Sequence, residues 1–451
     1  MYPPVWPLGA VRRCLGVITD RGTIATETGQ RLHYKTAADL HALMFDHDLQ
    51  LWSGSILRLD VYQGLRAMPG TVVTCTKEGA PLQLRLRNGR KVRTITSAAM
   101  GLGITADPAA LPILRRLFTF LGIPDMTTSG AIGQATIRQS WPSDLGPVSR
   151  PHAACFDFVR DRLLGGRVDS ILLGRRFRRA FEADINNAYL AEAQRLPGGT
   201  AAWYSGLGNE PADMVTGLFD CTIILTRDLP LGPFGIRVDG RTNDYPAKRG
   251  AYHAPLWFED VALLREDGHT VILYQGWYWR SWTTALASWA RRMHNARRTA
   301  PTDLAPFIKK AIVAAIGRFG AARERYVLAD QPGPGDKPVV DPQDGPVDAW
   351  VHTEPSDRGE CQVHWASYIL AGVRRRVWQA ARPHAEAGTL IATNYDAIYT
   401  TDRPAVRPST GLGGWKVKVH HDAISQHARW WSSKEAGATM PGVPLASRPP
   451  P

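Results

Sequence analysis

The sequence predicts an α+β (mixed α/β) protein with more than one domain. Short apolar runs of strand length alternate with amphipathic stretches of helical period in both halves of the chain. Hydrophobic residues make up 44% of the sequence, so a sizeable core can form. A length of 451 residues suits two or three domains, and the pattern of the expected elements changes near residue 151.

Residues 1–150 are predicted to form a compact, strand-rich domain. The run 82–86 alternates apolar and polar residues and is followed by Asn88-Gly89, a turn signal that predicts a hairpin. Strands are expected at 15–19, 55–60, 71–74 and 82–86, and helices at 37–46 and 108–121.

From residue 151 onward the sequence predicts helices and strands in close succession. Helices are expected at 156–164, 186–195, 284–298, 304–316 and 364–382, strands at 178–184, 218–225 and 270–274, and a hairpin of 389–393 with 397–400. The stretch 331–358 is rich in Pro, Gly and Asp, which predicts a mobile loop. Residues 434–451 are expected to form a disordered tail.

The charge of the chain predicts an anionic partner. The formal net charge is +13 and the isoelectric point is near 9.7, which suits neutralisation of nucleic-acid phosphates. An ordinary basic enzyme would fit the charge equally well. Five dispersed cysteines without a Cys-x-x-Cys pair argue against a zinc site and for reduced thiols in the cytoplasm of a bacterial cell. No apolar run approaches the ~20 residues that would span a membrane.

Two carboxylates with a basic helix between them indicate the chemistry. Asp184 follows a strand-like run, and Asp396 lies at the tip of the predicted hairpin 389–400. Between them, Lys309 lies on an amphipathic helix. Carboxylates from separate segments can hold two Mg²⁺ ions about 3.5–4 Å apart, and a cation can meet a triphosphate. This order of residues is what a two-metal nucleotidyl transferase needs.

The segment around Asp184 carries the first motif of a family resemblance. Residues 165–420 resemble the family B DNA polymerases of the compact phage, plasmid and organellar type, whose first motif reads Asp-x-x-Ser-Leu-Tyr-Pro. Here the run is Asp-Ile-Asn-Asn-Ala-Tyr-Leu, from Asp184 to Leu190. The resemblance implies that Asp184 bridges two metals, that the Ile185 carbonyl is a further ligand, and that Tyr189 packs under the sugar. The alternative is an N-capping Asp before a helix with a core Tyr.

The second motif of that family is Lys-x-x-x-Asn-Ser-x-Tyr-Gly. The helix here keeps Lys309 and Gly317 at the family spacing and has Val313 and Ile316 in place of Asn and Tyr. The resemblance implies that Lys309 binds the incoming triphosphate and that Gly317 contributes to the nucleotide pocket. Arg291 and Arg298, seven residues apart on one helix face, would bind the triphosphate too. The alternative is a solvated basic face.

The third motif reads Asp-Thr-Asp-Ser in the family and Asn394-Tyr395-Asp396-Ala397 here. The second aspartate, the essential metal ligand of the pair, is kept as Asp396. The alternative is a hairpin turn that happens to be rich in Asn and Asp. Further resemblances imply DNA contacts at Gly174, Arg175, Trp415, Lys416 and Lys418.

The resemblance implies a right-hand polymerase with palm, fingers and a reduced thumb, preceded by an RNase H-like exonuclease-type domain. The segment 1–150 contains no Asp-x-Glu, and Asp60 is the one candidate for a second metal ligand, so an exonuclease-like domain without proofreading is expected. An unrelated accessory domain is the alternative. The expected parts are 1–150 exonuclease-like, 151–283 palm, 284–325 fingers, 326–403 palm, 404–433 thumb and 434–451 tail.

The resulting prediction is a DNA polymerase that adds dNMP from dNTPs to a primer 3′-hydroxyl or a protein hydroxyl, with two Mg²⁺ ions or Mn²⁺ in their place. Its expected partners are primer-template DNA and dNTPs, together with a terminal or accessory protein that would supply grip or a priming hydroxyl. Two other functions stay open. One is a catalytically idle, polymerase-shaped nucleic-acid binder, and the other is a template-independent nucleotidyltransferase.

Overall fold

The structure is a computed structural model, which forms two compact units. It describes residues 14–18, 22–47, 49–53, 72–75, 81–85, 91–94, 110–123, 129–143, 145, 151–172, 175–206, 210–238, 242–320, 322–327, 337–341, 345–355, 362–426 and 429–432. Unit 1 comprises Met1–Trp141, Asn295–Arg318 and Ala322–Glu354, and unit 2 comprises Pro142–His294, Phe319–Ala321 and Pro355–Pro451.

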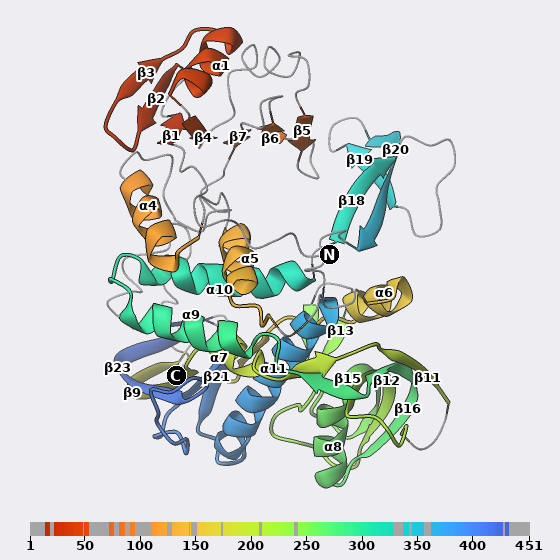
Figure 1. Ribbon diagram of the computed structural model, residues 1–451. Coiled ribbons are helices and arrows are strands. Elements are labelled where there is room, and N and C mark those ends of the chain that lie inside the picture. The colour runs from red at the N-terminus through yellow and green to blue at the C-terminus, as the bar shows by residue number, and fades with distance from the viewer. Residues whose placement is uncertain are drawn as a thin grey trace. The chain divides into compact units, whose positions relative to one another are not determined.

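Unit 1 contains a seven-stranded mixed sheet (Figure 1). Strand β1 is parallel to β4, and β4 is parallel to β7, while the outer strands pair antiparallel. The sheet order is β3 (Arg31–His33), β2 (Thr23–Thr26), β1 (Cys14–Ile18), β4 (Leu49–Ser53), β7 (Lys91–Thr94), β6 (Pro81–Arg85) and β5 (Val72–Cys75). The antiparallel pairing of β6 with β7 confirms the hairpin that the sequence predicts. The expected strand 55–60, with Asp60, lies outside the described residues.

Four helices of unit 1 are described: α1 (Ala37–Asp46), α4 (Ala110–Leu121), α5 (Ser129–Gln139) and most of α10 (Ala305–Phe319). Helix α1 has the predicted bounds. Helix α5 packs closely on α10, because a methyl group on Gly133 would collide with the Ala311 carbonyl oxygen. Arg116 of α4 forms an ion pair of 2.9 Å with Asp303, which lies just before α10.

The prediction of a loop over 331–358 was wrong in part. Strands β19 (Lys337–Asp341) and β20 (Gly345–Pro355) pair antiparallel within this stretch, and β18 (Ala322–Val327) joins them in a three-stranded sheet. Strand β20 reads Gly-Pro-Val-Asp-Ala-Trp-Val-His-Thr-Glu-Pro, so strand-forming residues lie inside a stretch of turn-forming composition.

The main sheet of unit 2 has six strands and is covered by the long helix α11 (Val363–Glu386) (Figure 1). Its order is β24 (Arg429–Ser432), β23 (Trp415–Gln426), β9 (Arg176–Ile185), β22 (Ala397–Thr400), β21 (Leu390–Tyr395) and β8 (Arg167–Ser170). Val373 and Val377 of α11 pack on Ala183, Ile185 and Ile398 of the sheet, all nearly inaccessible to solvent. Because α11 covers one face of β9, the alternate side chains of this strand point to the opposite face of the sheet.

A second, four-stranded sheet in unit 2 builds a separate hydrophobic cluster. Its order is β11 (Ala202–Ser205), β16 (Thr270–Trp279), β12 (Thr216–Leu225) and β15 (Gly250–Trp257), all antiparallel. Val261 and Leu264 of helix α8 (Phe258–Glu266) pack on this sheet. Smaller elements are α6 (Ala153–Asp161), α7 (Ala188–Glu192), α9 (Ala287–Thr299), β10 (Leu196–Gly198), β13 (Ile236–Val238), β14 (Thr242–Asp244) and β17 (Ser281–Thr283).

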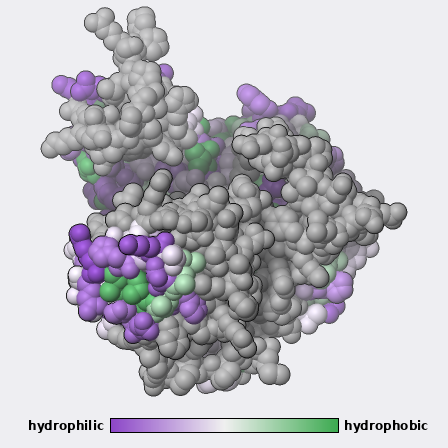
Figure 2. Space-filling model, turned by 90° about the horizontal axis from the view of Figure 1, so that it is seen from above, coloured by the Kyte–Doolittle hydropathy of each residue, from purple (hydrophilic) through white to green (hydrophobic). Residues whose placement is uncertain are grey.

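No helix within the described ranges is long and apolar enough to cross a membrane. Figure 2 shows one face of the molecule, where the described residues at the surface are mostly hydrophilic and the hydrophobic ones form small areas among them. The tail predicted at 434–451 lies outside the described residues.

Candidate active site

Strand β9 places Asp184 on the face of the sheet away from α11. Successive side chains of a strand point to opposite faces. Ala183 and Ile185 are buried in the core under α11, with exposed fractions of 0% and 1%. Asp184 therefore points to the other face, where it is half-buried. The Ile185 side chain belongs to the core, so only the backbone of Ile185 can serve a site.

The hairpin β21–β22 brings Asp396 to the end of β9, as the sequence predicts. Asp396 lies in the turn between the two strands, and Tyr395 before it has a positive φ of 55°. Ala397 pairs with Asp184 across β22 and β9. The backbone N–H of Ile185 donates to the carbonyl oxygen of Asp396 at 2.9 Å. Two carboxylates from distant parts of the sequence thus meet at neighbouring strand ends.

The loop before β23 fixes the backbone of the first motif. The N–H of Asn186 donates to the carbonyl oxygen of Gly414 at 2.7 Å, and the N–H of Gly413 donates back to Asn186 at 2.8 Å. The Asn186 side chain adds a hydrogen bond of 2.8 Å to the carbonyl oxygen of Thr410. Gly413 has a φ of 77°, a conformation that glycine adopts without strain. The glycine-rich run before Trp415 therefore holds the carboxylate segment in place.

Tyr189 lies on α7, next to the two carboxylates. Asn187 precedes the helix with a φ of 53°, and its side chain forms a hydrogen bond of 2.8 Å with His294 of α9. Burial is the main cause that raises the pKa of Tyr189 to about 12, and the negative charge of Asp396 raises it further. Tyr189 is therefore a neutral phenol at ordinary pH, close enough to Asp396 to feel its charge.

Asn394, in the position of the family's first aspartate, interacts with Tyr399 of β22. Burial raises the pKa of Tyr399, and the charges of Glu182, Asp184 and Asp396 raise it further, while a side-chain hydrogen bond with Asn394 acts in the opposite direction. The phenol of Tyr399 is thus surrounded by the acidic groups of this face. Asn394 belongs to the site as a neutral hydrogen-bonding group.

Strand β23 brings lysines to the same face of the sheet. Lys416 pairs with Asp184 in the sheet register and is exposed. Lys418 pairs with Glu182 and forms an ion pair with its carboxylate, which also contacts His420 Nε2 at 2.8 Å. Trp415 is half-buried and packs against the core cluster under α11. Its DNA contact, like those of the two lysines, stays a prediction.

Gly166 is a residue of the site that the sequence analysis missed. A methyl group on Gly166 would lie 2.5 Å from Cδ1 of Tyr395, so only glycine leaves room for that ring. Arg167, the next residue, pairs with Tyr395 across β8 and β21. The signal in the sequence was the pair Gly165-Gly166, which directly follows the helix expected at 156–164. Of the DNA contacts that the resemblance implies, Gly174 lies outside the described residues, and Arg175 is exposed.

The residues predicted to bind the triphosphate lie on α9 and α10. Lys309, Val313 and Gly317 are all exposed and follow one another at four-residue spacing, so they share one face of α10. Ile316 is buried, with 4% exposure. Arg291 and Arg298 of α9 are both exposed. Lys309 and Arg298 belong to unit 1, and Arg291 belongs to unit 2 with both aspartates.

The oxygen donors at the end of β9 suit a hard divalent cation. Mg²⁺ takes oxygen ligands and commonly uses one or two carboxylates with substrate phosphates. Asp184, Asp396 and the Ile185 carbonyl supply such donors on adjoining segments. In the part of the chain that the structure describes, no group of three or more His, Cys, Asp or Glu side chains comes together as a metal site. Substrate phosphates would have to complete the coordination.

Comparison with known proteins gives a family and a fold. Residues 122–331 match the family model described as DNA polymerase type B, organellar and viral. This match includes Asp184 and Lys309 and ends before Asp396. No curated protein matches the chain in sequence.

The solved structures of Phi29 DNA polymerase share the fold over most of both chains. The ternary complex with primer-template DNA and incoming nucleotide substrates has a TM-score of 0.64 and 13% identity, covering 92% of this chain and 86% of that one. The binary complex with primer-template DNA has a TM-score of 0.63 and 12% identity, covering 92% and 85%. The chain is therefore similar to type B DNA polymerases of the organellar and viral kind over residues 122–331, and it shares the fold of Phi29 DNA polymerase.

Proposed function

We propose that the protein is a DNA polymerase that transfers dNMP from a dNTP to a primer 3′-hydroxyl. The observation that carries the proposal is the meeting of Asp184 and Asp396, which the 2.9 Å hydrogen bond from Ile185 to Asp396 holds at adjoining strand ends. A pair of carboxylates beside a half-buried neutral tyrosine is a suitable binding place for a divalent metal and a nucleotide. The protein-hydroxyl primer of the sequence prediction remains a variant of the same chemistry.

The residues have distinct roles in this proposal. Asp184, Asp396 and the Ile185 carbonyl hold two Mg²⁺ ions, or Mn²⁺ in their place. Bound divalent ions favour ionisation of the attacking hydroxyl and neutralise charge on the leaving pyrophosphate. Tyr189, whose phenol is uncharged at neutral pH, packs against the sugar without repelling phosphates.

The cationic groups bind the polyphosphate and the DNA. Lys309 meets the triphosphate on the exposed face that it shares with Gly317, together with the guanidinium groups of Arg291 and Arg298. Lys416 follows the primer strand, since it is exposed beside Asp184. The net charge of +13 supports DNA as the partner, because neutralised phosphates release counterions. The Phi29 DNA polymerase structures contain primer-template DNA and nucleotides, which supports the same assignment.

The domain roles follow the same proposal. We assign the six-stranded sheet to the palm, α9 and α10 to the fingers, and the sheet of β1–β7 to an exonuclease-type domain without proofreading. The parallel strands β1, β4 and β7 support an RNase H-like arrangement. We assign residues 404–433 to a reduced thumb, and a terminal or accessory protein is the proposed partner that adds grip on the DNA.

A catalytically idle nucleic-acid binder is the second candidate. Asn394 in place of a carboxylate favours it, as does Val313, an apolar residue 44% exposed beside Lys309. An idle binder would keep the fold and the salt-sensitive attraction for DNA, but no selection would maintain the Asp184–Asp396 geometry.

Primer extension tests the proposal. The full chain is incubated with Mg²⁺ or Mn²⁺ and dNTPs, on templated and untemplated primers, beside Asp184→Asn and Asp396→Asn. Asp228→Asn is the matched control, because Asp228 is an exposed aspartate whose carboxylate pairs with Lys248 and accepts from the backbone N–H of Arg249. Template-directed extension that both site variants lose supports the polymerase. Untemplated extension would indicate a template-independent transferase, and no extension together with DNA binding would favour the idle binder.

A further inference from the structure

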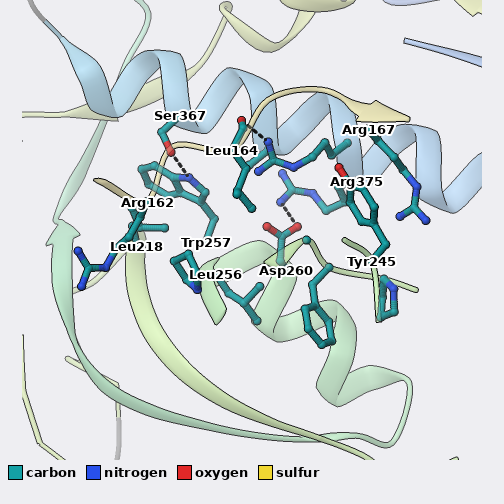
Figure 3. A pocket seen from close by; sticks show the side chains of 16 residues that line it. Arg162, Leu164, Arg167, Leu218, Tyr245, Leu256, Trp257, Asp260, Ser367 and Arg375 are labelled. Atoms are coloured by element: carbon teal, nitrogen blue, oxygen red, sulfur yellow. Dashed lines mark hydrogen bonds and ion pairs between the residues drawn. The ribbon is translucent and has the colours of Figure 1, made fainter. Parts of the chain in front are cut away.

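A cavity rich in arginine lies in unit 2, on a different face of α11 from the one that covers the sheet (Figure 3). The space between its lining atoms is about 450 Å³ when the solvent in front of its opening is included. Its lining includes the guanidinium groups of Arg162, Arg167, Arg374 and Arg375, and one carboxylate, that of Asp260. Four cations around one cavity need an explanation that the nucleotidyl-transfer site does not supply.

Three of the four arginines are paired with carboxylates, and one of these pairs joins Arg167 to Asp169. Arg162 forms a bidentate pair with Asp220, with N–O distances of 2.6 and 2.8 Å. Arg375 forms an ion pair of 3.0 Å with Asp260, visible in Figure 3. Bidentate and hydrogen-bonded pairs of this kind satisfy both charges. The charges of Arg162 and Arg375 are therefore satisfied within the protein, and neither residue requires an anion in the cavity.

Arg374 has no such balance. It donates to the carbonyl oxygens of Leu164 and Gly165 at 2.8 and 2.9 Å, and none of the ion pairs found among the described residues includes it. Burial lowers the pKa of Arg374. Arg374 is half-buried, so its charge carries a desolvation cost that an anion in the cavity would offset.

Two buried donors of the cavity also lack an acceptor. Arg167 is 1% exposed, and its Nε and Nη1 are used by Asp169 and by the Gly232 carbonyl oxygen. Its Nη2 has no hydrogen-bond partner within the described part of the chain, and neither does the hydroxyl of Tyr245. The Arg167 guanidinium lies 4.2 Å from the centre of the Tyr245 ring, so the two donors belong to one place. Buried donors normally have partners.

We propose that this cavity binds a single phosphate group, which accepts hydrogen bonds from Arg167 Nη2 and Tyr245 Oη and neutralises Arg374. A phosphate has several acceptor oxygens in a tetrahedral arrangement, so it can meet donors that come from different elements. A water molecule would satisfy the two donors and leave the charge of Arg374 unbalanced. A planar carboxylate would use its two oxygens on one guanidinium.

Occupancy of the cavity would be felt at the active site. Arg374 lowers the pKa of Tyr189, against the effect of Asp396. A phosphate that neutralises Arg374 would weaken this influence. The phosphate belongs either to free inorganic phosphate or to a nucleic-acid strand, and both present the same chemistry to the cavity.

Phosphate binding is measured on the full chain in EDTA, without nucleotide, metal or primer, so that the result does not depend on polymerase activity. Inorganic phosphate is titrated by calorimetry and by its effect on the melting temperature, with chloride at matched ionic strength as the reference. The Lys309→Ala variant serves as background, because it removes the cation proposed to bind a triphosphate.

Tyr245→Phe is the decisive variant, because it removes only a hydroxyl that has no protein partner. The proposal predicts that phosphate raises the melting temperature and that Tyr245→Phe weakens phosphate binding roughly tenfold or more, since hydrogen bonds to charged groups are strong. Arg374→Met should weaken binding further. Tyr274→Phe is the matched control, because Tyr274 is an exposed tyrosine of β16 outside the cavity.

Absence of phosphate binding would overturn the proposal, as would binding that Tyr245→Phe leaves unchanged. If Tyr245→Phe melts at a higher temperature than the wild type and phosphate changes neither melting temperature, the Tyr245 hydroxyl is a buried donor without a ligand, and the proposal is wrong. A short single-stranded oligonucleotide then distinguishes the sources: displacement of bound phosphate from the wild-type chain assigns the cavity to a nucleic-acid phosphate, and no displacement assigns it to the free ion.

Discussion

The backbone N–H of Ile185 donates a hydrogen bond of 2.9 Å to the carbonyl oxygen of Asp396. This bond joins two segments that are more than 200 residues apart in the sequence. It sets Asp184 and Asp396 side by side without using either carboxylate. The relative position of the two residues is therefore fixed by backbone pairing.

Gly166→Ala should reduce primer extension through Tyr395. The added methyl group would lie 2.5 Å from Tyr395 Cδ1, so the ring or the strand must move, at a cost of about 1–3 kcal/mol. The movement would shift the turn that carries Asp396. Extension rate and melting temperature are measured together.

Gly206→Ala is the control for this experiment, because the nearest atom to its added methyl group is 3.8 Å away. The double variant Gly166→Ala with Tyr395→Ala should recover stability, since the colliding ring is gone. Unchanged extension in Gly166→Ala would show that the position of Tyr395 has no bearing on the site.

Lys416→Met should weaken DNA binding through the loss of one phosphate contact. Lys416 is exposed opposite Asp184, so its charge is available to DNA. The slope of log K against log salt concentration should fall by about 0.9, the value for one neutralised phosphate. Binding is measured by fluorescence anisotropy between low and moderate salt.

Lys418→Met is the comparison for Lys416→Met. Lys418 already pairs with Glu182, so its removal should mainly affect stability, by about 1 kcal/mol after allowance for its partly exposed side chain. If log K for DNA binding has the same slope against log salt concentration in both variants, Lys416 and Lys418 do not differ in their contact with DNA phosphates, which would contradict this prediction.

Tyr189→Phe should reduce the loss of stability at high pH. The pKa of Tyr189 in the folded protein is about 12, above its value near 10 in the unfolded chain. The contribution of Tyr189 to the free energy of unfolding is therefore fully present below pH 10 and is lost as the pH rises toward 12. Melting temperatures between pH 8 and 11.5 should fall less steeply for Tyr189→Phe than for the wild type.

The Asp396→Asn variant tests the cause of this shift. Removing the negative charge of Asp396 should lower the pKa of Tyr189. The pKa is measured by titrating phenolate absorbance in proteins with Tyr189 and in matching proteins with Tyr189→Phe, and taking the difference. Tyr274→Phe, at an exposed tyrosine, controls for general effects of the substitution. A pKa that does not move in Asp396→Asn would mean that Asp396 and Tyr189 are not neighbours in solution.

The sequence was informative where a local pattern decides the structure. The hairpin with Asp396 at its tip, the strand that ends at Asp184 and the bounds of α1 were all predicted correctly, because alternation, turn residues and helical periodicity are local signals. The helix expected at 186–195 is shorter, because Asn187 takes a left-handed conformation and β10 begins at Leu196.

Other features depend on contacts between distant segments. Gly166 is required by the ring of Tyr395, which lies more than 200 residues later in the sequence. The orphan donors of Arg167 and Tyr245 become visible only when β8 and the β14 region fold together. Strands β19 and β20 were missed because Pro, Gly and Asp dominate the composition around them.

Metal-dependent primer extension by Asp184→Asn and Asp396→Asn shows whether these two carboxylates hold the catalytic metal ions. The account predicts that each variant keeps the wild-type melting temperature within a few degrees and loses extension by roughly 10³-fold or more, since several kcal/mol of metal-based stabilisation disappear. Asp228→Asn should extend primers like the wild type. Extension that persists in a well-folded Asp184→Asn or Asp396→Asn protein would contradict the assignment of these two carboxylates as the metal ligands of a polymerase.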